Sequence, residues 1–250
     1  MFKKFIHKIY TILVYVNYYF TKKKINKFIF IHPPQSGGNT LDFYFKINFG
    51  LRNYKIINHF SYKNFNFSAK ELNKFFLIYG HFPYEFALRN GYNKNFFYFT
   101  SIRDPKQRYL SNYYRNKRDF EKSNKKYISL EEFLKLRFTE GQDNFYVRFF
   151  SSKNIHYNPA IIINNEHVND SVESLKKLDF IFHMDNMEKN LLTFKKKLTI
   201  IIDMAKFFQL HKNKVSNSTY PNLSLKEREL LEKLTLYDNK LYEEIKKIKK

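Results

Sequence analysis

A short strand followed by a glycine-bearing loop constrains the fold of this chain more than any other feature. Residues 28–31 form a continuous apolar run, Phe-Ile-Phe-Ile, which is typical of a strand buried in a parallel sheet. Two prolines follow, then the polar stretch 35–40 with two glycines, and then an apolar-periodic stretch that starts at Leu41. A buried strand that passes through a glycine-bearing turn into a helix is the local architecture of a phosphate-binding loop.

The residues of this loop suit an anion. Gly37 and Gly38 allow the backbone to approach a ligand closely, and the N–H groups at the start of the helix point at it with the positive end of the helix dipole behind them. Asn39 or Thr40 is expected to cap the helix. The loop is not a Walker A motif, because no lysine follows Gly38 and the glycine spacing differs. Taken alone, it is equally compatible with an ordinary strand-to-helix turn.

A second stretch repeats the strand-to-helix pattern. Residues 96–102 form another apolar, β-prone run, and Arg-Asp-Pro follows, with Pro105 at the expected first position of a helix. Arg103 then lies at the carboxyl end of a strand, where open α/β sheets bind ligands. Ser111 lies two turns into the predicted helix. Both side chains could bind one phosphate; the alternative is that Arg103 is a solvated surface residue.

The two motifs together resemble the sulfotransferases that use 3'-phosphoadenosine 5'-phosphosulfate. The chain is most similar to the branch that sulfates carbohydrates, which includes the heparan 2-O-sulfotransferases. That family reads Pro-Lys-Thr-Gly-Gly-Thr-Ser where this chain has residues 34–40, and Arg-Asp-Pro, then Arg, then Ser where it has residues 103–105, Arg108 and Ser111.

Further matches follow in the family's order: Gly-His-Phe at 80–82, Asp-Asn at 143–144 with Arg148, the stretch 180–198, and a last helix with Asp238 and Tyr242. The resemblance therefore covers about residues 27–248.

The resemblance implies a role for each matching residue. The first loop would hold the 5'-phosphosulfate, Arg103 and Ser111 would hold the 3'-phosphate, and His81 would be the general base. Histidine is the side chain best suited to take a proton near neutral pH, although a His in a strand-end turn can also be structural. The turn-rich segment 212–221 would close over the nucleotide. No metal is expected. The first-loop residues are Gln35, Ser36, Gly37, Gly38, Asn39 and Thr40.

Gln35 is the departure from the family pattern, which has a lysine there. Losing one electrostatic donor of this kind can slow a reaction by about 10²–10³. Lys106 and Arg108 are the candidates to supply the missing charge. The departure motivates an alternative function, a catalytically weakened protein that only binds nucleotide or glycan.

Apolar strand patterns alternate with helical ones along the chain, which predicts an α/β fold, a mostly parallel sheet flanked by helices, in the P-loop-like arrangement of sulfotransferases. Further strands are expected at 72–79, within 53–67 and at 180–183, with loops around the basic run 115–126 and over 154–169. Helices are expected at 40–49, 107–117, 129–138, 143–150, 171–178, 186–198 and 224–249. A basic and apolar N-terminal segment, 1–24, should precede a single domain, 25–250.

The charge of the chain predicts anionic partners. There are 45 Lys and Arg against 23 Asp and Glu, giving a net charge of +22. Charge alone allows a nucleotide, an acidic glycan, an anionic lipid or a nucleic acid, and the family resemblance implies a carbohydrate acceptor. A nucleic-acid-binding protein is the weaker alternative, because most of the 20 Tyr and 29 Phe fall in apolar runs that indicate core.

The N-terminal segment has basic ends around an apolar stretch, residues 9–20. This stretch is shorter than the roughly 20 residues that a membrane-spanning helix needs, and no signal-peptide cleavage site follows it. We expect a packed or surface helix, with peripheral contact to a membrane as the alternative. The expected location is cytoplasmic, with membrane association left open.

Overall fold

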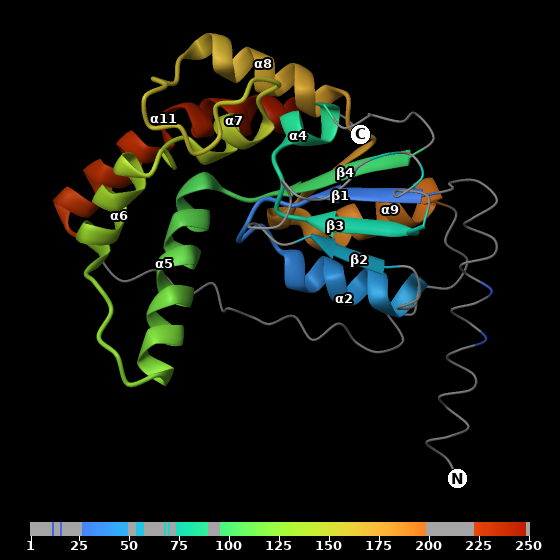
Figure 1. Ribbon diagram of the computed structural model, residues 1–250, viewed down its shortest axis with the longest axis horizontal. Helices are drawn as coiled ribbons and strands as arrows, with labels where there is room; N and C mark the ends of the chain where they lie inside the picture. The colour runs from blue at the N-terminus through green and yellow to red at the C-terminus, as the bar shows by residue number, and fades with distance from the viewer. Residues whose placement is uncertain are drawn as a thin grey trace.

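The computed structural model describes residues 12, 16, 27–49, 54–57, 68, 70, 74–89, 96–198 and 223–248 (Figure 1). The N-terminal segment 1–24, apart from Ile12 and Val16, lies outside the described residues, as does the predicted closing segment 212–221.

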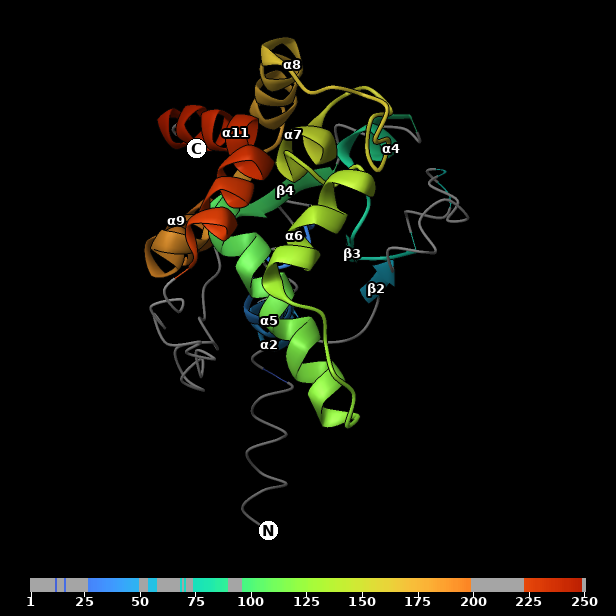
Figure 2. The same ribbon diagram turned by 90° about the vertical axis from the view of Figure 1, so that its left-hand side faces the viewer.

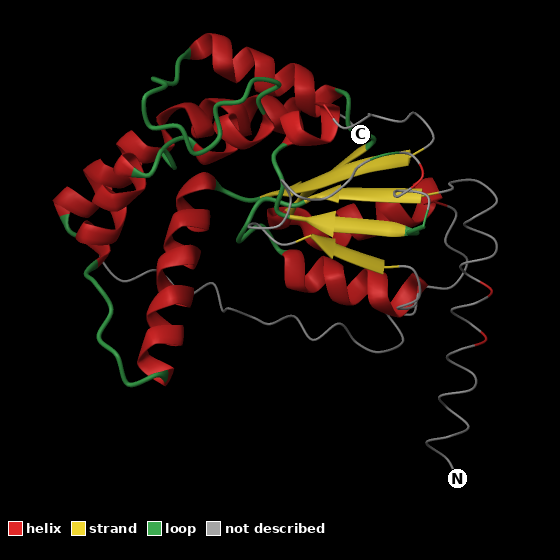
Figure 3. Cartoon of the chain, in the orientation of Figure 1, coloured by secondary structure: helices red, strands yellow, loops and turns green. Residues whose placement is uncertain are grey.

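The centre of the fold is a five-stranded sheet, in which every neighbouring pair of strands is parallel (Figure 3). The strand order is β2-β3-β1-β4-β5. The predicted α/β class with a mostly parallel sheet is therefore confirmed. The strands are β1 (Lys27–Ile31), β2 (Tyr54–Ile57), β3 (Leu77–Gly80), β4 (Phe96–Ile102) and β5 (Phe180–His183).

The helices pack on both faces of the sheet and beyond its carboxyl edge (Figures 1 and 2). The described ones are α2 (Gly38–Phe49), α4 (Tyr84–Arg89), α5 (Pro105–Lys122), α6 (Leu130–Thr139), α7 (Phe145–Phe150), α8 (Asn165–Lys176), the short 3₁₀ helix η2 (Met184–Asn186), α9 (Met187–Leu198) and α11 (Leu225–Lys247).

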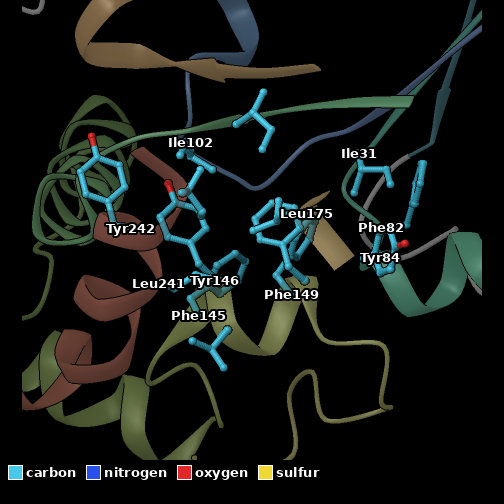
Figure 4. Close-up of a cluster of buried hydrophobic side chains, with 14 of the residues drawn as sticks. Ile31, Phe82, Tyr84, Ile102, Phe145, Tyr146, Phe149, Leu175, Leu241 and Tyr242 are labelled. Atoms are coloured by element: carbon cyan, nitrogen blue, oxygen red, sulfur yellow. The ribbon is translucent and has the colours of Figure 1, made fainter. Parts of the chain in front are cut away.

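Side chains of β1 alternate between the two faces of the sheet, as the pleat of a strand requires. Phe28 and Phe30 pack in the core shared with α2 and α9, whereas Ile29 and Ile31 pack in the core shared with α4, α7 and α11. Figure 4 shows part of this second core, where Ile102 lies beside Tyr146 and Ile31 lies beside Phe82 and Tyr84. Because both faces are covered, the strand reads as a continuous apolar run.

Three helices differ from the expectations. α5 continues to Lys122, so most of the basic run that we expected around a loop is helical. Its charges are compatible with a helix because oppositely charged residues recur at four-residue spacing, as in Arg115–Asp119. α8 begins at Asn165, inside the expected loop 154–169, because the Asn164 side chain caps it. The short helix α4 was not expected.

Candidate active site

The predicted site residues lie along one edge of the sheet, at the carboxyl ends of the strands. The chain places β3 on one side of β1 and β4 on the other, so the direction of the winding reverses beside β1. Ligands of open α/β sheets bind at this kind of switch point. The loops that follow β1 and β4 both begin here, and α5 stands beside this edge (Figure 1).

The loop after β1 bends sharply before it enters α2. Gln35 and Gly37 both adopt positive φ angles, 67° and 79°. The carbonyl of Gly37 accepts hydrogen bonds from the N–H groups of Thr40 at 3.1 Å and Leu41 at 3.2 Å, which close the first turn of the helix. The first N–H groups of a helix have no acceptor within it, so this bend directs them out of the helix start, as an anion site requires.

Both positions favour glycine, Gly37 because of its positive φ and Gly38 because of the packed rings around it. A Cβ atom on Gly37 would lie 2.1 Å from the Met184 sulfur, and a Cβ on Gly38 would lie 2.2 Å from the His32 ring and 2.6 Å from the Tyr79 hydroxyl oxygen. Side chains therefore pack directly onto the backbone at both positions.

The remaining polar residues of the loop lie in the first turn of α2. The helix begins at Gly38, so Asn39 and Thr40 are inside it and neither is the capping residue that we expected. The Asn39 side chain is exposed and the Thr40 side chain is partly exposed.

Ser36 has no exposed surface and is held by hydrogen bonds to α7 and β4. Its hydroxyl lies 2.7 Å from the Tyr146 hydroxyl, and its carbonyl accepts a hydrogen bond of 2.6 Å from the Ser101 hydroxyl in β4. Thus the Ser36 side chain faces the protein interior.

The loop after β4 is built differently. The Asp104 carboxylate caps α5 by accepting from the Gln107 N–H at 2.8 Å, and Pro105 occupies the first helical position, as predicted. Arg103 lies between the strand and this cap, partly exposed, and its backbone N–H donates to the Tyr146 hydroxyl at 3.0 Å. Asp104 thus serves the helix cap.

The two loops meet through side chains. Ser111, two turns into α5, donates its hydroxyl hydrogen to the Gln35 side-chain oxygen at 3.4 Å. The residues that we expected around the two phosphates are therefore brought together from positions far apart in the sequence. The candidates to replace the family's lysine lie elsewhere: Lys106 pairs with Glu232 of α11, and Arg108 is buried.

His81 follows β3 directly and lies beside the first loop. Its Nδ1 atom is 2.8 Å from the His32 carbonyl oxygen, and the two imidazole rings have centroids 4.7 Å apart. A carbonyl oxygen only accepts hydrogen bonds, so Nδ1 carries the hydrogen and Nε2 carries the lone pair. This tautomer is the one that can take a proton at Nε2.

His32 is a site residue that the sequence analysis did not single out. Its Nδ1 lies 2.9 Å from the Tyr79 hydroxyl, its ring stacks on the Tyr79 ring, and only 3% of it is exposed. Burial, helped by the nearby His81, keeps the pKa of His32 well below its ordinary value, so its ring is neutral at pH 7. Its position directly after β1, on the same face as Phe30, was the available signal.

Tyr146 of α7 and Arg108 of α5 were also not assigned to the site. The Tyr146 hydroxyl contacts both loops, as described above, and points toward the sheet in Figure 4. Arg108 is 1% exposed, and its guanidinium carbon lies 3.9 Å from the ring centroid of Phe145 and 4.2 Å from that of Tyr109. Arg108 therefore belongs to the packing beneath the second loop.

Arg148, a further match to the family, serves the structure of the helical layer. It is 1% exposed, pairs with the Asp143 carboxylate at 2.7 Å, and donates to the carbonyls of Asn158 and Ile161 at 2.8 Å. These bonds fasten the connection between α7 and α8.

The fold and this edge define an α/β protein in which two strand-to-helix loops meet as a candidate anion-binding site. The chain belongs to the sulfotransferase family, whose sequence profile matches residues 17–248. A search of curated proteins gave no significant match. Among the described residues, no group of three His, Asp or Glu side chains is arranged to hold a metal ion, and none of the helices is long and apolar enough to cross a membrane.

Proposed function

We propose that this protein transfers a sulfuryl group from 3'-phosphoadenosine 5'-phosphosulfate to a hydroxyl group of a carbohydrate. Membership of the sulfotransferase family supports sulfuryl transfer in general. The observation that carries the proposal for the donor is the contact between Ser111 and Gln35, because it makes one site of the two loops. Such a site suits a nucleotide with phosphate groups at two positions.

Each loop would hold one end of the donor. The backbone N–H groups of residues 35–39 and the Thr40 hydroxyl would bind the 5'-phosphosulfate, with Ser36 holding the loop in place. Arg103 and Ser111 would bind the 3'-phosphate, Arg103 through charge-assisted hydrogen bonds. The positive φ of Gly37 and the buried Ser36 side chain fit this division.

His81 would act as the general base. Its Nε2 takes the proton of the acceptor hydroxyl, and the acceptor oxygen bonds to sulfur as the bond between sulfur and the bridging phosphate oxygen breaks. The products are a sulfate ester and adenosine 3',5'-bisphosphate. The charge that develops on the leaving phosphate would be stabilised by the backbone of the first loop, since positioning and electrostatics dominate such transfers.

The acceptor class is supported by charge. The chain carries a net charge of +22, and Arg118, Lys125 and Lys126 near the end of α5 are exposed. An acidic carbohydrate is the acceptor that this charge favours. The second candidate function, binding without transfer, is favoured only by Gln35, whose neutral amide stands where the family has a lysine.

Transfer of labelled sulfate to a panel of carbohydrates tests the proposal. The wild-type protein should transfer, and His81→Ala should lose at least about 10²-fold in turnover, because a general base contributes about 10²–10⁴. His183→Ala is the matched control, since His183 also ends a strand at this edge and should retain transfer. Affinity for adenosine 3',5'-bisphosphate should change less than about twofold in His81→Ala. Undiminished turnover in His81→Ala would refute the assignment of the base, and no transfer by the wild type would favour the binding function.

A further inference from the structure

The Tyr146 hydroxyl lies where the two loops approach each other. It accepts a hydrogen bond of 3.0 Å from the backbone N–H of Arg103 and shares a hydrogen bond of 2.7 Å with the Ser36 hydroxyl. One oxygen atom thus touches the residue that opens the second loop and a residue inside the first. A phenol has one hydrogen to donate and lone pairs to accept, so it can make both bonds at once.

Tyr146 is itself firmly held. It is 1% exposed, and burial raises its pKa to about 12, so the phenol keeps its hydrogen at neutral pH. The next residue, Val147, donates its backbone N–H to the Asp238 carboxylate of α11 at 2.9 Å. At the start of α7, the Asn144 N–H donates to the Leu234 carbonyl of α11 at 2.7 Å. The hydroxyl is therefore fixed relative to α11 and the core.

The buried position of Ser36 shows that the Tyr146 hydroxyl contacts the first loop from the inner side of that loop. Its side chain is fully buried, and its carbonyl is bonded to Ser101. A ligand on the outward face of the loop would meet the backbone, with Tyr146 behind it. The hydroxyl can therefore fix the spacing of the loops without contacting the ligand.

We propose that Tyr146 is a positioning residue that holds the two loops at the spacing a nucleotide with both a 5'- and a 3'-phosphate requires. This inference rests on the proposed donor site. A ligand that spans both loops benefits from their fixed spacing, because binding then does not have to order one loop relative to the other. A ligand that contacts one loop gains little. Tyr146 therefore couples the two phosphate sites.

Tyr146→Phe tests the coupling by removing one oxygen atom. Affinity for adenosine 3',5'-bisphosphate, measured by calorimetry, should fall about tenfold, since two hydrogen bonds are lost and a buried N–H is left without an acceptor. Affinities for adenosine 5'-phosphate and adenosine 3'-phosphate, measured by displacement of the bisphosphate, should change by about twofold or less. Tyr109→Phe is the matched control: Tyr109 is a buried phenol that also contacts Arg108, but its hydroxyl donates to the Gln142 carbonyl.

The outcomes are distinct. An unchanged affinity for the bisphosphate in Tyr146→Phe, or an equal loss for both monophosphates, overturns the coupling while leaving the proposed function intact. No binding of the bisphosphate by the wild type overturns the proposed function and the coupling with it. If Tyr146→Phe does not fold, Ser36→Ala removes the other partner of the 2.7 Å contact and should give the same selective loss for the bisphosphate.

Discussion

The loops after β1 and β4 share an outline but present different chemistry. Each follows a buried strand and enters a helix at the same edge of the sheet. The first is shaped by positive φ angles at Gln35 and Gly37, and the buried Ser36 side chain points away from the outer surface. The second has a regular helix start, capped by Asp104, with Arg103 and Ser111 as the groups that we propose bind the ligand.

This difference predicts how each loop tolerates substitution. A site made of backbone N–H groups depends on the path of the chain, so it should tolerate a new side chain where the backbone is unaffected. A site made of side chains depends on their identity. We therefore expect the change from the family's lysine to Gln35 to be mild, and the loss of Arg103 to be severe.

The largest effect should come from Arg103→Ala. Hydrogen bonds to a charged group are worth about 1.5–3 kcal/mol, so affinity for adenosine 3',5'-bisphosphate should fall by about 10- to 150-fold in calorimetry. Ser111→Ala should act in the same direction but more weakly. Arg118→Ala removes an equal charge from an exposed position of α5 and serves as the control. Equal affinities in Arg103→Ala and wild type would show that the second loop does not bind the nucleotide.

The second-largest effect should come from Gly38→Ala, because this substitution disturbs the path of the first loop. The added carbon would lie 2.2 Å from the His32 ring and 2.6 Å from the Tyr79 hydroxyl oxygen, so either these packed rings or the backbone must shift. Overpacking of this kind costs about 1–3 kcal/mol, which denaturant unfolding would measure, and nucleotide affinity should fall with it. Phe43→Ala, at an exposed position of the same helix, is the control. Wild-type stability together with wild-type affinity would contradict a backbone-built site.

The smallest effect should come from Gln35→Lys. The new ammonium would lie near the place where the leaving phosphate gains charge, so turnover in the labelled-sulfate assay should rise or stay the same. Gln35→Met removes the amide and adds no charge, which separates the effect of charge from the loss of the 3.4 Å contact with Ser111. A large fall in turnover with Lys but not with Met would mean that the site requires a neutral residue here.

Local sequence patterns were sufficient to predict most strands and helices of the fold. The buried strands were visible because helices cover both faces of the sheet, which makes the buried positions of β1 and β4 apolar or small. The capping box at Ser224 likewise marked the start of α11. Two predictions based on composition were wrong. The basic residues after Arg115 were assigned to a loop although α5 continues to Lys122, and the Asn-rich stretch around Asn164 was assigned to a loop although α8 begins at Asn165.

Residues of the candidate site could be predicted only where they belong to a recognisable sequence motif. Arg103 and His81 directly follow β4 and β3, and Ser111 lies two turns into α5, where its hydroxyl contacts Gln35. Tyr146 is separated from Ser36 by 110 positions, and nothing in its neighbourhood marks it as different from the adjoining aromatics. Its contact with the loops depends on how α7 packs on the sheet, which no local pattern specifies.

Titration of the wild-type protein with adenosine 3',5'-bisphosphate and with adenosine 5'-phosphate tests the central claim, that the two loops form one site for a doubly phosphorylated nucleotide. We expect one binding site per chain, with an affinity for the bisphosphate at least about tenfold higher, because only this ligand engages both loops. In Arg103→Ala that preference should largely disappear. Equal affinities of the wild type for the two nucleotides, or no binding of either, would contradict the account.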